Sequence, residues 1–139
     1  MTLESLGGTL RTHLVSFRQL PGTFAICRLP SDSHLPAWAI SAESFMSITR
    51  SEDELSIVCP QDSVPPEHRT GSRWACFKLE GPFSFSAVGI LTSFIAPLAE
   101  AGIPIFAVST YDTDYVLVKE EDAARATEAL ERAGHQSVR

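Results

Sequence analysis

The fold is decided by residues 89–135, which read GILTSFIAPLAEAGIPIFAVSTYDTDYVLVKEEDAARATEALERAGH. The apolar side chains of the first part recur at the spacing of one helical face, at Leu91, Phe94, Ile95 and Leu98. Gly102 follows as a stop signal for that helix. Two apolar runs, 103–109 and 114–119, surround the short polar turn TYDT, and this arrangement predicts an antiparallel hairpin.

A second helix is predicted after the hairpin, because the segment EEDAARATEALERAGH begins with acidic residues and carries a face of small side chains. That inner face consists of Ala123, Ala126, Leu130 and Ala133, and Gly134 ends the helix. Upstream, WACFKLEG (74–81) alternates like a strand, and the tail HQSVR adds a short one. The order strand, helix, strand, strand, helix, strand predicts an α+β, ferredoxin-like unit with its helices on one face of an antiparallel sheet.

The first half of the chain repeats this order less clearly. Four strands are expected in TLRTHLVSF, TFAICRL, SFMSITR and ELSIVCP. Pro30 and Pro36 leave room only for a short helix around Ala37–Glu43. The sequence therefore predicts two tandem βαββαβ units: a degenerate N-terminal unit over residues 1–72 and a C-terminal unit over residues 73–139. Each is small enough that the two are expected to pack together.

Composition narrows the classes of function. The 139 residues carry a net charge of −6 and contain no basic run, so nucleic acid is not an expected partner. No apolar stretch approaches the length of a membrane span, and the first 20 residues lack the pattern of an export signal. Three widely spaced cysteines in apolar surroundings (Cys27, Cys59 and Cys76) predict buried, reduced thiols. We expect a cytoplasmic globular protein.

Catalytic and metal-binding signatures are absent from the sequence. It contains no G-x-S-x-G, phosphate-binding loop, H-E-x-x-H or G-x-G-x-x-G motif, and its four histidines are scattered. Asp112 and Asp114 resemble a carboxylate pair, but aspartate is also a common turn residue. We therefore expect no enzyme, no metal site and no cofactor.

Two features suit a zwitterionic ligand. In FSFSAVGIL (83–91) a loop becomes a helix, and free N–H groups near Gly89 and Ile90 would donate hydrogen bonds to a carboxylate. The turn TYDTD offers hydroxyls and carboxylates that could hold an ammonium group. The alternative is an ordinary loop and an ordinary turn. The run 103–109 adds an uncharged strand at a sheet edge, which predicts a homodimer or packing between the two units.

GILTSFIAPLAEAGIPIFAVSTYDTDYVLV resembles the ACT domains, small amino-acid-sensing regulatory modules. The segments STYDTDYVLV and ELSIVCP are most similar to the subfamily of the cytosolic arginine sensors (CASTOR), and the regulatory ACT pairs of aspartate kinases are similar too. This resemblance implies ligand contacts in the loop, at Ser86, Ala87, Gly89 and Ile90, and in the turn, at Thr110, Tyr111 and Asp114. Ser86 and Ala87 stand where the sensors have acidic residues, so a guanidinium would lose those partners.

The resemblance implies a regulatory protein that binds a free amino acid or a similar small metabolite at a junction between ACT units. A homodimer of this chain would resemble one such sensor, and ligand binding would change its assembly or its contact with a regulated protein partner. The alternative from another class is a constitutive dimeric interaction module without a ligand. The response of stability to free amino acids distinguishes the two.

Overall fold

The structure, a computed structural model, describes residues 13–40, 43–84 and 88–139. It divides into two compact units, which are considered one at a time. Cys76–Arg139 together with the described residues 13–20 form the C-terminal unit, and Pro21–Ala75 form the N-terminal unit. Among the described residues, no helix combines the length and the apolar character that crossing a membrane requires.

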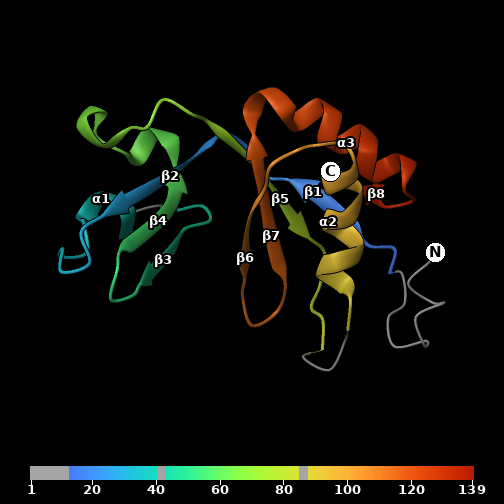
Figure 1. The fold of residues 1–139 in the computed structure, drawn as a ribbon, viewed down its shortest axis with the longest axis horizontal. Helices are drawn as coiled ribbons and strands as arrows, with labels where there is room; N and C mark the ends of the chain where they lie inside the picture. The colour runs from blue at the N-terminus through green and yellow to red at the C-terminus, as the bar shows by residue number, and fades with distance from the viewer. Residues whose placement is uncertain (1–12, 41–42, 85–87) are drawn as a thin grey trace. The chain divides into compact units, whose positions relative to one another are not determined.

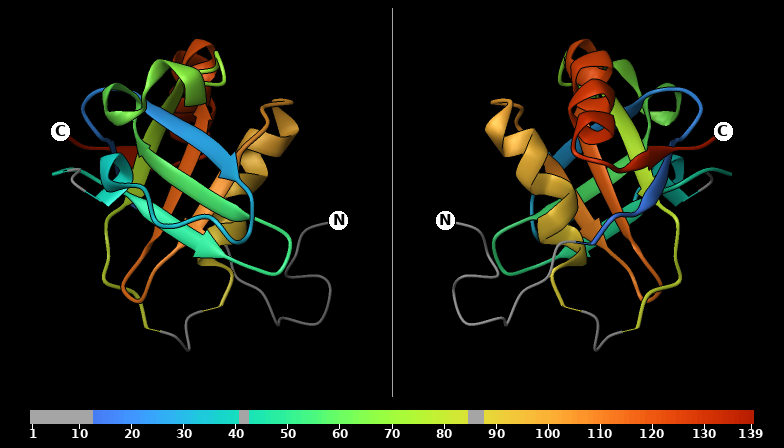
Figure 2. Two further views of the ribbon diagram at one scale, coloured as in Figure 1. Left: turned by 90° about the vertical axis from the view of Figure 1, so that its left-hand side faces the viewer. Right: turned by 90° about the vertical axis from the view of Figure 1, so that its right-hand side faces the viewer.

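The C-terminal unit follows the predicted order of strands and helices. Its elements are β5 (Trp74–Leu79), α2 (Ile90–Glu100), β6 (Phe106–Ser109), β7 (Asp114–Lys119), a 3₁₀ turn (Glu120–Asp122), α3 (Ala123–Arg132) and β8 (Gln136–Ser137). Both helices lie on the same face of the strands (Figures 1 and 2). This arrangement is the α+β architecture that the helical and alternating patterns predict.

A strand from the beginning of the chain completes this sheet. β1 (Ser16–Gln19) pairs with β5 in antiparallel orientation and with β8 in parallel orientation, so the strand order is β6-β7-β5-β1-β8. The division of the structure therefore differs from the boundary expected between residues 72 and 73, because the backbone hydrogen bonds of β1 are made with the C-terminal unit.

The core of the C-terminal unit lies between the sheet and its two helices. Phe17 of β1 makes edge contacts with Phe77 of β5, at 5.6 Å between ring centroids, and with Phe94 of α2, at 5.3 Å. Helix α3 contributes Ala126 and Leu130, both fully buried. The prediction that Ala133 joins this inner face is wrong: Ala133 lies beyond the last turn of α3 and is exposed.

Both helices end where glycine is predicted to end them. The N–H of Gly102 (φ 73°) donates to Ala99, and that of Ile103 donates to Leu98, which satisfies the last carbonyls of α2. Gly134 (φ 104°) closes α3 in the same way. Because Ile103 is used in closing the helix and Pro104 has no N–H to donate, β6 begins at Phe106 and not at Ile103 as predicted.

The N-terminal unit is a smaller sheet with one short helix. Its elements are β2 (Phe24–Leu29), α1 (Ala37–Ile40), β3 (Ser47–Arg50), β4 (Leu55–Pro60) and two 3₁₀ turns (Gln61–Ser63 and Pro66–His68). The strand order is β3-β4-β2, all antiparallel, and the helix is as short as the flanking prolines predict. Its core contains Cys27 and Cys59, and all three cysteines are buried and free, as predicted.

Candidate ligand-binding site

The site begins at the hairpin between β6 and β7. Its turn is closed by the N–H of Thr110, which donates to the carbonyl of Thr113 at 2.8 Å. The hydroxyl of Thr110 donates to the same carbonyl at 3.0 Å. One step outward, the Ser109 hydroxyl donates to the Asp114 carboxylate. These bonds fix which way the turn presents its polar groups.

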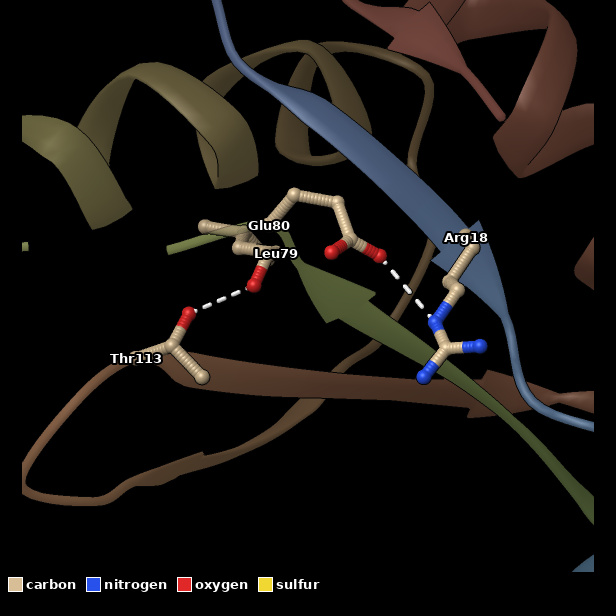
Figure 3. A network of polar contacts seen from close by, with 4 residues as sticks. All are labelled: Arg18, Leu79, Glu80 and Thr113. Carbon is tan, nitrogen blue, oxygen red and sulfur yellow. Dashed lines mark hydrogen bonds and ion pairs between the residues drawn. The ribbon is translucent and has the colours of Figure 1, made fainter. Parts of the chain in front are cut away.

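Thr113 ties this turn to the neighbouring strand. Its side chain is 7% exposed, and its hydroxyl donates to the carbonyl of Leu79 at 2.6 Å (Figure 3). Glu80, the residue after β5, forms an ion pair with Arg18 of β1 at 3.0 Å (Figure 3). Both charged side chains are more than a third exposed, so this pair adds little stability. The buried hydroxyl is therefore the stronger anchor of the turn.

The loop after β5 packs closely against the same turn. The N–H of Phe83 donates to the carbonyl of Asp112 at 2.8 Å. A Cβ at Gly81 would lie 2.9 Å from that carbonyl oxygen, so the close approach of the two backbones requires glycine. Residues 81–83 are thereby held beside the hairpin.

The first turn of α2 forms the opposite wall. Gly89 (φ 85°, ψ 6°) is its N-cap, a left-handed conformation that glycine adopts without steric cost. The carbonyl of Gly89 accepts from the N–H of Ser93, the first bond of the helix. The N–H groups of the helix that come before Ser93 have no partner within the helix, and the helix dipole favours an anion beside them.

These elements line an open cavity of about 340 Å³. Its lining consists of Phe83, Ser84, Gly89, Ile90, Leu91, Thr92, Ser109, Thr110, Tyr111, Asp112, Thr113 and Asp114. Five of the residues predicted as ligand contacts line it together, namely Gly89, Ile90, Thr110, Tyr111 and Asp114. The other two, Ser86 and Ala87, lie outside the described residues.

Sequence reasoning missed part of this wall. It did not name Phe83, Leu91 or Ser109 as ligand contacts, although all three line the cavity. Leu91 belongs to the apolar face whose spacing predicts the helix. The lining also contains two carboxylates, and no Lys, Arg or His stands among its described members. In the described part of the chain no group of three or more His, Cys, Asp or Glu side chains is placed to hold a metal ion.

Comparison with known proteins identifies the domain that contains this site. The family model of the ACT domain matches residues 69–132, and a second model, of an N-terminal domain, matches residues 22–67. The chain contains an ACT domain over residues 69–132. The match includes the helix, the hairpin and the cavity between them.

The curated relatives are similar to this chain over most of its length. The human cytosolic arginine sensor for mTORC1 subunit 1 is 29% identical over 133 residues, and the bovine sensor is 28% identical; each alignment covers 94% of this chain. The chain spans about 40% of the length of these sensors.

Solved structures share the fold. A crystal structure from Agobacterium tumefaciens is 42% identical, with a TM-score of 0.82, and the match covers 91% of this chain and 93% of that one. The aspartate kinase of Clostridium acetobutylicum, described as an allosteric enzyme, is 13% identical with a TM-score of 0.60; the match covers 91% of this chain and 37% of the kinase. The likeness to the kinase is one of fold alone.

Proposed function

We propose that this protein is a cytoplasmic sensor that binds a free amino acid, or a similar small metabolite, in the cavity between α2 and the hairpin turn. The observation that carries the proposal is that unlike groups line one pocket of about 340 Å³: the start of α2 at Gly89 and Ile90, and the hairpin turn with Asp114. An α-carboxylate suits the helix terminus, and an ammonium group suits the carboxylate.

The proposal includes a homodimer. β6 pairs only with β7 among the strands of the described residues, so its second edge has backbone groups available for another strand. Phe106–Ser109 carries no charged side chain that would oppose such pairing. A ligand beside this edge would stabilise one arrangement of the two copies over another and so regulate a partner protein. The similar proteins are named as arginine sensors, which supports a regulatory role for this chain.

The alternative is a constitutive dimeric interaction module, for which the same uncharged edge is expected. A thermal-shift panel of free amino acids at 5–10 mM separates the two. A ligand at about 100 times its Kd adds about 2.7 kcal/mol, which raises Tm by several degrees. Because the lining holds two carboxylates, we expect aspartate and glutamate to give the smallest shifts. A panel without any shift, with the dimer intact by light scattering, would support the interaction module.

Asp114→Asn is expected to weaken binding of the responding amino acid by about 10- to 100-fold, since a charge-assisted bond contributes about 1.5–3 kcal/mol. The amide keeps the shape of the side chain and an oxygen for the Ser109 hydroxyl, so Tm of the free protein should change little. Isothermal titration calorimetry measures the effect. Asp32→Asn, at an exposed aspartate of the N-terminal unit, is the matched control. Equal affinity in both variants would remove Asp114 from the site.

A further inference from the structure

A short segment before β1 lies against the start of α2. We call residues 13–15 the β1 lead. The backbone N–H of His13 donates to the Ser93 hydroxyl at 2.9 Å. The Nε2 atom of His13 lies 2.8 Å from the carbonyl oxygen of Val88, the residue before the N-cap of α2. A carbonyl oxygen only accepts hydrogen bonds, so Nε2 carries the proton and donates.

A second histidine contacts the same first turn of α2. The N–H of Val15 donates to Nδ1 of His135 at 3.2 Å, so that nitrogen is the acceptor of the ring. Nε2 of His135 then donates to the carbonyl of Ser93 at 3.0 Å. His135 is 4% exposed and packs 5.3 Å from the Phe94 ring. The first turn of α2 is thus fixed at Ser93 by the β1 lead and by the end of α3.

His13 differs from His135 because its bond reaches the residue next to Gly89. The carbonyl of Val88 and the N–H of Gly89 belong to one planar trans peptide, in which the two groups point in opposite directions. Holding the carbonyl therefore sets the direction of that N–H. Glycine needs this restraint, because without a Cβ its backbone has more accessible conformations than any other residue. Gly89 lines the cavity, on the wall where the proposed carboxylate would bind.

We propose that His13 is a positioning residue of the ligand site. Its imidazole holds the Val88–Gly89 peptide in the orientation that directs the Gly89 N–H to the carboxylate of the bound ligand. His13 itself is not among the residues that line the cavity, so it acts through the peptide and not by contact with the ligand. This inference rests on the proposed function, since the ligand is the one argued above.

The test compares His13→Ala with His13→Gln, whose side-chain amide keeps an N–H donor. His34→Ala, at an exposed histidine of the N-terminal unit, is the matched control. The first measurement is the Gly89 amide signal in ¹H–¹⁵N spectra of the ligand-free protein. The second is the Kd of the amino acid that gives the largest thermal shift, and the third is Tm. We expect His13→Ala to move the Gly89 signal and to raise Kd about 3- to 10-fold, the effect of losing one hydrogen bond.

His13→Gln should recover most of the affinity and of the Gly89 signal, and His34→Ala should change neither. Equal affinity and an unmoved Gly89 signal in His13→Ala would overturn the positioning role while leaving the sensor proposal intact. So would an equal loss of affinity in both His13 variants that follows a fall in Tm, because that pattern is one of general destabilisation. If the wild-type protein binds no amino acid, the sensor proposal fails, and the Gly89 signal still decides whether His13 orients this peptide.

Discussion

Replacing Phe17 with alanine is expected to lower the free energy of unfolding by about 3–5 kcal/mol, the usual effect of removing a buried aromatic ring. Phe17 is fully buried and joins three elements, because its ring contacts Phe77 of β5 and Phe94 of α2. Few neighbours can move into the space, since β1 is held by hydrogen bonds on both sides. Urea denaturation followed by circular dichroism measures the loss.

Gln19→Ala is the matched control for this prediction. Gln19 lies two residues further along β1 and is exposed, so its truncation should change stability by less than about 0.5 kcal/mol. A similarly small effect of Phe17→Ala would contradict the place of β1 between β5 and β8. The experiment thus tests a strand whose two partners lie about 60 and 120 residues away in the sequence.

Much of the C-terminal unit is predictable because its signals are local. The apolar spacing in 90–100 defines a helical face within three turns, and Gly102 supplies the left-handed residue that ends it. The hairpin is equally local, since two β-prone runs and their turn lie within 17 residues, 103–119. β7 has the bounds that the sequence predicts, Asp114–Lys119. In these segments propensity, periodicity and turn chemistry agree.

The place of β1 could not be read from the sequence. SFRQ is a strand of four residues, and nothing in four residues specifies partners that lie about 60 and 120 positions away. Its preference for the sheet of the C-terminal unit comes from Phe17, which completes a cluster with aromatic rings of β5 and α2. Tertiary packing decided the assignment, whereas local propensity only indicated a strand.

The candidate site is also predictable only where its sequence signals are local. The turn TYDTD shows its polar groups in the sequence, and the resemblance to the ACT-domain sensors implies Thr110, Tyr111 and Asp114 as ligand contacts. The bond from Thr113 to Leu79 and the contact between Gly81 and the turn join segments that are about 30 residues apart. Sequence patterns carry no signal for such contacts. Nor do they indicate that His13, 75 residues before Val88, reaches its carbonyl.

Stability is also expected to fall in alkaline solution because of the buried thiols. Burial raises the pKa of Cys76 from 9.0 to about 12 and that of Cys59 to about 11, since a thiolate inside the protein would lose its hydration. For Cys59 the nearby Cys27 adds a smaller effect in the same direction. Between pH 9 and the raised value, the unfolded chain has released a proton that the native protein still holds.

The sign follows from this difference in bound protons. The contribution of the Cys76 thiol to the free energy of unfolding is fully present below about pH 9. It decreases as pH rises, because the unfolded state then binds fewer protons than the native state. For Cys76 the loss is about 1.4 kcal/mol per pH unit, or about 3 kcal/mol between pH 9 and 11. Urea titrations at pH 8, 10 and 11 on the wild type and on Cys76→Ala isolate one thiol, because all other groups are shared. The stability advantage of the wild type over the variant should shrink by about 3 kcal/mol over this range. Parallel pH profiles would mean that Cys76 ionises as readily in the native protein as in the unfolded chain, which its complete burial beside Phe77 on β5 makes unfavourable.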